Sequence, residues 1–159
     1  MRDLLKGSYV NSIEDVAAVL ALCRPGPLKA GMTAEYGVRK RSGEDDQAWY
    51  PHESLKEVLS PTFGVLVYQE QVMRMAVQCA GFTEVDSDTL RKAMGKKIAS
   101  EMKKYEVRFV DGCQEISMMP LSTAEKLWEE VKGFAAYGFN KSHAVGYAHT
   151  TYQTAYLKA

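Results

Sequence analysis

Apolar positions recur along most of this chain with the three- and four-residue spacing of an α-helix. Ser12 and Asp15 form an acidic variant of the capping box, and the apolar positions after them predict a helix that stops before Pro25. The segment 69–80 places its apolar side chains on one face, and Gly81 is a typical helix stop. This pattern predicts a chain that is mainly α-helical.

The remaining elements follow from the same kind of pattern. Ser122 and Glu125 form a capping box, which predicts that Ser122 caps the start of a helix. The apolar face expected for this helix consists of Ala124, Leu127, Trp128, Val131, Phe134 and Ala135. The apolar, β-branched run Phe63–Tyr68 is expected to form at most one short β-strand or two-stranded piece. No repeat, low-complexity stretch or linker divides residues 1–159, so we expect a single module. Further helices are expected over residues 30–41, 52–59 and 86–94, after a cap at Ser100, and from about Lys141 to the end of the chain.

Composition narrows the class of protein. Hydrophobic residues make up 46% of the chain and charged residues 25%, which provides enough apolar material for a packed core and excludes a disordered tail. No apolar run approaches the length needed to cross a bilayer, and the first residues lack the apolar stretch of a signal peptide. We therefore expect a cytoplasmic location and no membrane partner.

The net charge is zero, but the charges are segregated along the sequence. Residues 24–41 carry five basic residues and one acidic residue, and residues 89–108 carry seven basic and two acidic residues. Residues 43–59, by contrast, are acidic. Two local basic clusters on a neutral chain indicate a site for a polyanion and argue against a general coat on nucleic acid.

A helix stop followed at once by a helix start lies near the C-terminal end. Gly138 is expected to take the left-handed conformation that ends one helix, and Asn140 and Ser142 are good caps for the next. The unpaired amides and positive dipole end of that next helix would lie beside Lys141 and His143, an arrangement that suits phosphate. An ordinary turn between two helices explains the same residues, and chemistry alone leaves both readings open.

A second candidate is a basic run in the middle of the chain. Lys92 and Lys96 are four residues apart and fall on one helical face, while Leu90 and Met94 face the core. Gly95 is unusual here, because a helical glycine costs about 1 kcal/mol relative to alanine, and it indicates that the backbone bends or approaches something closely. A solvated, charged helix end with a C-terminal glycine is the alternative.

Three other groups of residues have simpler explanations. Arg24, in a rigid Arg-Pro-Gly-Pro turn, can bind phosphate with its two-pronged guanidinium or cap the last carbonyls of its own helix. Asp86 and Asp88 lie at an expected helix start, where capping explains them. His143 and His149 are six residues apart and cannot grip one metal ion together, so no metal site is expected.

Four motifs follow one another in an order and spacing that resemble one known family. They are Arg24-Pro25-Gly26-Pro27-Leu28, Tyr68-Gln69-Glu70-Gln71-Val72-Met73, Leu90-Arg91-Lys92-Ala93-Met94-Gly95-Lys96-Lys97 and Tyr137-Gly138-Phe139-Asn140-Lys141-Ser142-His143. Together they resemble the alpha subunit of bacterial DNA polymerase III, the C-family replicative polymerase. The resemblance covers essentially the whole chain and implies a fingers region, with both ends inside the family's continuous polypeptide.

The resemblance implies that the chain binds the incoming deoxynucleoside triphosphate and the templating strand of primer-template DNA. A triphosphate is strongly anionic, and fixed cations and helix-end amides stabilise it without reorganising. An electrostatic clamp is expected from Arg91, Lys92, Lys96, Lys97 and Lys141. Phosphate or sugar oxygens are expected to be oriented by Asn140, Ser142 and His143, with support from Arg24. The residues expected to brace these motifs are Gln69, Glu70, Gln71, Gly95 and Gly138, and the first three are also candidates for contact with nucleic acid.

Catalysis is not expected from this chain alone. The aspartates with which C-family palms bind two magnesium ions are absent from it, so Mg²⁺ is implied only for the complete polymerase. The expected partners, besides the nucleotide and DNA, are the palm and thumb of the polymerase and other replisome subunits. One alternative is a non-catalytic helical module that binds single-stranded DNA or a protein partner, which steep salt dependence without preference for triphosphate would favour. Another is a freestanding metal-dependent enzyme, which magnesium-dependent turnover by the purified chain would favour.

Overall fold

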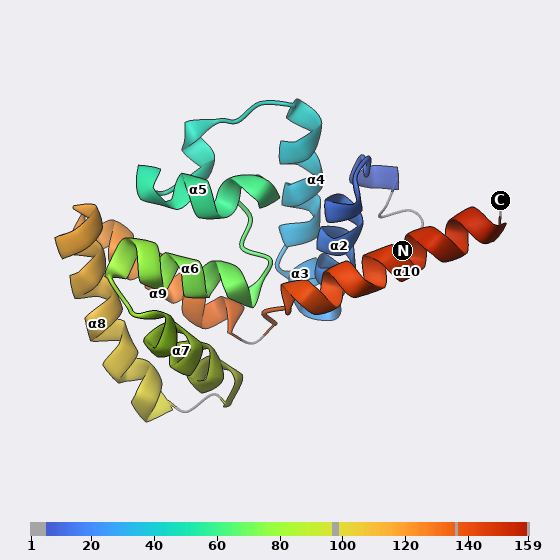
Figure 1. Ribbon diagram of the computed structural model, residues 1–159. Helices are drawn as coiled ribbons and strands as arrows, with labels where there is room; N and C mark the ends of the chain where they lie inside the picture. Colours follow the sequence, from blue (N-terminus) through green and yellow to red (C-terminus); the bar gives the residue numbers. More distant parts are fainter. Residues whose placement is uncertain (1–5, 97–98, 136, 159) are drawn as a thin grey trace. The chain divides into compact units, whose positions relative to one another are not determined.

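Helices make up most of the computed structural model, which describes residues 6–96, 99–135 and 137–158 (Figure 1). Its helical content is 78%, and these residues contain no β-strand, which confirms the predicted mainly α fold class. The chain separates into two compact units. The central unit is Asp46–Gly138, and the terminal unit combines Met1–Asp45 with Phe139–Ala159. Each unit has its own buried residues.

Most of the central unit is formed by α6 (Gln69–Ala80), α7 (Glu84–Lys96), α8 (Ala99–Ser117) and α9 (Leu121–Phe134). Helix α6 packs against α7 and α8, and α8 packs in turn against α7 and α9 (Figure 1). Helix α6 has the predicted bounds, and Gly81 after it takes the left-handed conformation with φ of 66°. The pieces that precede it are η1 (Gln47–Trp49), η2 (Glu53–Leu55), α5 (Lys56–Leu59) and η3 (Ser60–Thr62).

The core of the central unit is built around Trp128, which is fully buried. Its ring centroid lies 5.2 Å from that of Phe109, which in turn lies 6.4 Å from that of Phe82. Burying a large apolar side chain is worth about 1.5–3 kcal/mol, so the stripe that α9 buries holds this helix on the unit. Five of the six residues predicted for this stripe are buried, namely Ala124, Leu127, Trp128, Val131 and Phe134, and the sixth, Ala135, is the C-terminal cap of the helix.

The apolar run before α6 is a buried connection and not a strand. Phe63 has a φ of 54°, so the chain turns there. Val65 and Val67, which follow, are only 4% and 2% exposed. The amide of Val67 donates to Oε1 of Gln71, a side chain of α6, at 2.8 Å. The β-branched character of this run therefore reflects burial, and a side chain satisfies an amide that a strand would have paired.

Helices α6 and α8 lie close together at Gly112. A Cβ at this position would lie 2.8 Å from the carbonyl carbon of Ala80 and 3.0 Å from its Cα, and closer still to its carbonyl oxygen. These are backbone atoms at the end of α6, which cannot rotate away as a side chain could. The crossing of α6 and α8 therefore requires glycine.

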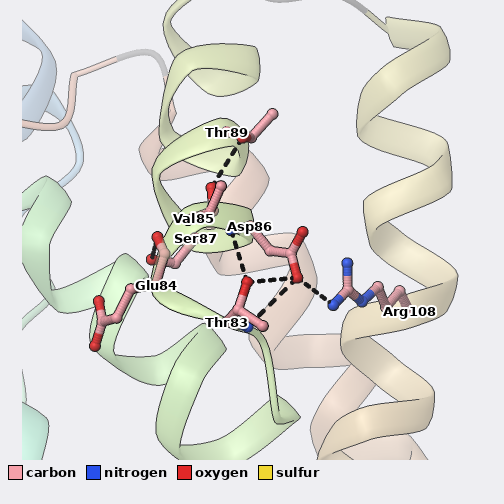
Figure 2. A network of polar contacts seen from close by, with 7 residues as sticks. All are labelled: Thr83, Glu84, Val85, Asp86, Ser87, Thr89 and Arg108. Atoms are coloured by element: carbon pink, nitrogen blue, oxygen red, sulfur yellow. Dashed lines mark hydrogen bonds and ion pairs between the residues drawn. The ribbon is translucent and has the colours of Figure 1, made fainter.

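Thr83 caps α7, which begins at Glu84 and thus two residues before the predicted start. The amide of Asp86 donates to the Thr83 hydroxyl at 3.1 Å, and that hydroxyl donates to the Asp86 carboxylate at 2.8 Å (Figure 2). Arg108 of α8 donates to the same carboxylate oxygen at 2.6 Å, and its guanidinium lies 4.3 Å from the ring centroid of Phe82. The network thus joins the start of α7 to α8.

Protonating Asp86 is expected to weaken the central unit in acid. The hydrogen bond from Arg108 and that from Thr83 lower the pKa of Asp86 to about 2. The unfolded chain has a pKa of about 3.9 for this group, so its stabilisation is complete above that value and is lost as the pH falls toward 2. We expect the urea midpoint to fall more steeply over this pH window in wild type than in Asp86→Asn, as measured by tryptophan fluorescence.

Both tryptophans, Trp49 and Trp128, lie in the central unit, so this signal reports on that unit. Because Arg108 is partly exposed, added salt should reduce the difference between the two proteins. Identical pH profiles for wild type and Asp86→Asn at low salt would show that the network contributes nothing to stability.

The terminal unit contains α2 (Ile13–Leu22), α3 (Pro25–Lys29), α4 (Met32–Ser42) and α10 (Lys141–Lys158). Helix α2 packs against α10 and α4, and α3 packs against α4. The predicted capping box of α2 is present, with reciprocal hydrogen bonds between Ser12 and Asp15. Helix α10 buries Ala144 and Ala148 completely, four residues apart on one face. Their small side chains allow the backbone of α10 to lie close to its neighbour.

A buried ion pair joins α2 to α4 in the terminal unit. Asp15 pairs with Lys40, and the two side chains are 5% and 8% exposed. The carboxylate also accepts the Tyr36 hydroxyl at 2.9 Å and the amides of Asn11 and Ser12 at 3.0 and 2.9 Å. Burial alone would raise the pKa of Asp15, but these hydrogen bonds, with that from Lys40 foremost, hold it below its usual value.

Two predicted helix caps are wrong. Helix α8 begins at Ala99, one residue before the predicted cap Ser100. Helix α9 begins at Leu121 with Pro120 at the cap position, so Ser122 lies inside the first turn and does not cap the helix. The carbonyl of Pro120 already accepts the amide of Ala124 at 3.0 Å, which starts the helical ladder before Ser122. The predicted stop of the first helix before Pro25 is confirmed, since α2 ends at Leu22. The residues after Arg24 form α3 and not only a turn, because proline at the first position of a helix has the required φ and needs no amide partner.

Candidate functional site

The C-terminal half of α7 carries the predicted cations on its outer face. Leu90 and Met94 are buried, at 0% and 3% exposure, and fix which face of the helix points outward. The side chain of Lys92 is 59% exposed, and Lys96 is exposed as well. The structure therefore places Lys92 and Lys96 as the sequence predicts. Lys97 lies outside the described residues.

Asp88 holds two of these cations. It accepts Arg91 through Nε at 3.0 Å and Nη2 at 2.8 Å, and its other oxygen pairs with Nζ of Lys92 at 2.7 Å. The hydrogen bonds from Lys92 and Arg91 lower the pKa of Asp88. Sequence reasoning treated Asp88 as a cap, whereas its place three and four residues before the two cations predicts ion pairing. Any anion that binds Arg91 and Lys92 must compete with this carboxylate.

Gly95 leaves a gap in the side-chain cover of α7. It lies inside the helix without a positive φ, and a Cβ placed there would meet no described atom within 4 Å. No close packing within the described part of the chain accounts for a glycine at this position. The absence of a side chain leaves the backbone between Lys92 and Lys96 open to approach from outside.

Gln71, at the start of α6, uses both ends of its amide inside the protein. Its Oε1 accepts the amides of Val67 and Tyr68, and its Nε2 donates to the Thr62 hydroxyl at 2.7 Å and to the Val58 carbonyl at 3.3 Å. Gln71 is 6% exposed. Its geometry is that of a brace for the chain that leads into α6.

Gln69 and Gly138 lie against each other in the central unit. Nε2 of Gln69 donates to the carbonyl of Gly138 at 3.3 Å. The expectation that Gly138 is left-handed is wrong, because its φ is not in the positive range. A Cβ at Gly138 would instead lie 2.9 Å from Cγ of Gln69 and 2.9 Å from Cε1 of Phe134. Close packing, and not backbone conformation, accounts for this glycine. Glu70, which follows Gln69 in α6, is half-buried.

The start of α10 presents three polar side chains on its first turn. Asn140 is the cap, because its Oδ1 accepts the amide of His143 at 2.8 Å and its carbonyl accepts the amide of Ala144. Lys141, Ser142 and His143 are all exposed. Of the two predicted caps, Asn140 is the one that forms the bond. This end of α10 carries the positive pole of an 18-residue helix beside a lysine.

Arg24 takes the capping role that the sequence left as its alternative. Its Nε donates to the carbonyl of Ala21 at 2.8 Å, near the end of α2. Its guanidinium carbon lies 4.5 Å from the ring centroid of Phe139. Burial lowers the pKa of Arg24 from its usual value. The guanidinium is nevertheless charged at neutral pH, because arginine is not deprotonated in proteins.

The predicted residues thus form two groups, each inside one unit. Arg91, Lys92, Gly95 and Lys96 belong to the central unit, as do Gln69, Glu70, Gln71 and Gly138. Arg24, Asn140, Lys141, Ser142 and His143 belong to the terminal unit. In each group some members are exposed: Lys92, Gly95 and Lys96 in the central unit, and residues 140–143 in the terminal unit. These members present cations or a helix start suited to phosphate.

Two adjoining hollows of the terminal unit lie away from the predicted residues. They have volumes of about 410 and 530 Å³ and share Val10, Val16 and Tyr152 in their walls. Neither of these two is lined by a residue predicted to bind nucleotide.

The described residues include no group of three or more His, Cys, Asp or Glu side chains that could hold a metal ion. The chemistry of a two-magnesium centre, which needs clustered carboxylates, therefore does not fit this part of the chain. Among residues 6–96, 99–135 and 137–158, no helix combines the length and apolar character needed to cross a membrane.

Comparison with known families assigns the chain to a protein family. Residues 1–117 match the model of the bacterial DNA polymerase III alpha subunit finger domain. The chain belongs to this family. The finger-domain match includes Arg24 and the whole of α7, and full-length relatives extend it through α10. The DNA polymerase III subunit alpha of Aquifex aeolicus is 48% identical over all 159 residues, and that of Escherichia coli K12 is 45% identical over 163 aligned positions that cover the whole chain.

The finger-domain chain is much shorter than these relatives. It spans 13% of the Aquifex aeolicus subunit and 14% of the Escherichia coli subunit. The subunit from Campylobacter jejuni is 48% identical over 145 residues, which make up 91% of this chain and 12% of the relative. The relatives therefore cover both predicted groups, including the start of α10 that lies beyond residue 117.

Proposed function

We propose that this chain binds the incoming deoxynucleoside triphosphate, with the templating strand, during DNA synthesis by a complete DNA polymerase III. The observation that carries the proposal is the outer face of α7. Burial of Leu90 and Met94 directs Lys92 and Lys96 outward, and Gly95 between them leaves the backbone open. Because the chain belongs to the finger-domain family of a DNA polymerase subunit, the reaction in which this face would act is nucleotidyl transfer.

The chemistry of nucleotidyl transfer explains why fixed cations suit this role. Negative charge builds up on the leaving pyrophosphate, and positioned cations stabilise it without reorganising. Lys92 and Lys96 lie one helical turn apart on the same face, so their two ammonium groups can contact neighbouring phosphates of one triphosphate. The start of α10, where exposed Lys141 lies at the positive end of the helix dipole, is a second phosphate-binding element, and it is tested separately.

Binding of a labelled deoxynucleoside triphosphate tests the α7 element. The double variant Lys92→Ala/Lys96→Ala is expected to bind about tenfold or more weakly, because it removes two charge-assisted contacts to phosphate. Affinity is measured by titration at fixed, low salt. The matched control is Lys103→Ala/Lys104→Ala, which removes two exposed charges of the same basic segment from α8.

Equal affinity in wild type and the α7 variant would overturn the assignment of α7. Equal losses in the α7 variant and the α8 control would show that total charge matters and position does not. If the chain instead binds single-stranded DNA with steep salt dependence and shows no preference for triphosphate, the non-catalytic DNA-binding alternative replaces this proposal. Lys141→Ala, measured in the same way, tests the α10 element.

The same titration with Asp88→Asn gives a change of opposite sign. Removing the carboxylate releases Arg91 and Lys92 from their ion pairs and makes the local potential more positive. We expect this variant to bind triphosphate several-fold more tightly than wild type. Weaker binding would show that Asp88 is needed to orient the two cations.

We infer further that the chain acts as part of a larger polymerase and does not polymerise DNA alone, since its described residues offer no carboxylate cluster for magnesium. Binding to the palm and thumb and to other replisome subunits, and a cytoplasmic location, stay predictions. A primer-extension assay with the purified chain is expected to show no product.

A further inference from the structure

Four side chains of the terminal unit form a continuous stack that leads to the exposed His143. The Arg24 guanidinium lies 4.5 Å from the Phe139 ring centroid, and the Phe139 and His143 centroids are 5.6 Å apart at an interplanar angle of 48°. His143 in turn contacts Tyr147 edge to face, with centroids 4.6 Å apart and an angle of 63°. The His143 ring therefore has two aromatic neighbours, Phe139 and Tyr147.

The start of α10 produces this arrangement. Phe139, His143 and Tyr147 follow one another at intervals of four residues, which places His143 and Tyr147 one turn apart on one face of the helix. The Asn140 cap fixes the first turn by accepting the amide of His143. At the far end, the hydrogen bond from Arg24 to Ala21 anchors the guanidinium that covers Phe139. The stack is thus held at the His143 backbone by Asn140 and at the Arg24 end by the hydrogen bond to Ala21.

We propose that Tyr147 is a positioning residue for His143, holding the imidazole in the orientation in which it meets the phosphate or sugar of the nucleotide. This inference rests on the proposed function. An exposed side chain on a first helical turn samples several rotamers, and ordering it on binding costs free energy. Contact with Phe139 and Tyr147 orders the ring before the ligand arrives. Arg24 contributes through Phe139, as the end of the stack.

Edge-to-face contact uses the ring of Tyr147 and not its hydroxyl. Tyr147→Phe should therefore preserve the effect, and Tyr147→Ala should remove it. Tyr156→Ala is the matched control, because Tyr156 lies on the same helix, is 73% exposed and contacts Tyr152 rather than His143. Tyr147 is itself 57% exposed, so its truncation should leave the helical circular dichroism of the chain unchanged.

Two measurements on the 159-residue chain test the proposal. The first is the NMR position of the His143 Cε1 proton, assigned by its loss in His143→Gln, which ring currents from Tyr147 shift without any ligand. The second is the affinity for labelled deoxyadenosine triphosphate. We expect Tyr147→Ala to move the His143 resonance and to weaken binding several-fold. Tyr147→Phe and Tyr156→Ala should leave both close to wild type.

A double-mutant cycle with His143→Gln separates positioning from direct contact. If Tyr147 acts through His143, Tyr147→Ala should cause no further loss of affinity in the His143→Gln background. An equal loss in both backgrounds would overturn the proposal, because Tyr147 would then act on its own. A moved His143 resonance with unchanged affinity would overturn it too.

Failure of the proposed function gives a different result. If wild type shows no saturable triphosphate binding, nucleotide binding itself is overturned and the role of Tyr147 with it. If wild type binds but Lys92→Ala/Lys96→Ala and His143→Gln bind equally well, the assigned binding site is wrong, and the role of Tyr147 fails with it. If those variants lose affinity while Tyr147→Ala does not, only the positioning role fails.

Discussion

Gly112→Ala is expected to destabilise the central unit by about 3 kcal/mol, at the upper end of the range for overpacking. The added methyl group would lie 2.8 Å from the carbonyl carbon of Ala80 and closer still to its oxygen. Both atoms belong to the backbone at the end of α6, so relief requires α6 and α8 to move apart. That movement would in turn open the packing around Phe109, which is fully buried on α8.

Urea denaturation followed by tryptophan fluorescence measures this effect, since both tryptophans lie in the central unit. Gly95→Ala is the matched control, because it makes the same change inside α7 where a Cβ meets no described atom within 4 Å. It is expected to stabilise the unit by about 0.5–1 kcal/mol through helix propensity. If Gly112→Ala were as stable as wild type, the close crossing of α6 and α8 would be wrong.

Asp15→Asn is expected to destabilise the terminal unit by about 3–5 kcal/mol, the cost of breaking a buried ion pair by removing one partner. The substitution removes the carboxylate that pairs with Lys40, whose side chain is only 8% exposed and also donates to Oδ1 of Asn11. It also disturbs the hydrogen bonds from Tyr36 and the amides of Asn11 and Ser12. The loss should appear in hydrogen exchange of the α2 amides and in the unfolding curve followed by circular dichroism.

The double variant Asp15→Asn/Lys40→Met provides the decisive comparison. It removes both charges, so it should recover part of the stability that Asp15→Asn loses. Asp111→Asn, at an exposed carboxylate of α8, is the control and should change stability by less than about 0.5 kcal/mol. The free energy of unfolding lost by the double variant is compared with the sum of the losses in Asp15→Asn and Lys40→Met alone. A loss larger than this sum would show that the ion pair is not the source of the effect.

Local pattern was sufficient for much of this fold. The helix Gln69–Ala80, its stop at Gly81 and the capping box of Ser12 and Asp15 were all predicted, because the residues that specify them are within four positions of one another. The buried stripe of α9 was predicted for the same reason. The run Phe63–Tyr68 was harder, since β-branched residues suit both a strand and a buried loop, and only the amide of Gln71 distinguishes the two.

The candidate site was predictable in its composition and less so in its contacts. The outward face of Lys92 and Lys96 follows from helical period. The ion pairs of Asp88 follow from spacing too, although capping was the preferred explanation at that position. The contact of Gly138 with Gln69 joins residues 69 positions apart, which no local pattern can indicate.

The sequence by itself determined the helices, their buried faces, the segregation of charge and the motifs that mark the finger-domain family, because each depends on residues near one another along the chain. Only the tertiary structure decided why particular residues are needed. Gly112 and Gly138 are required by contacts with Ala80 and Gln69, and not by their own backbone conformation. Arg24 covers Phe139, and Asp15 is neutralised by Lys40. Each of these depends on which helices pack together, a choice made by the burial of whole faces and not by any local signal.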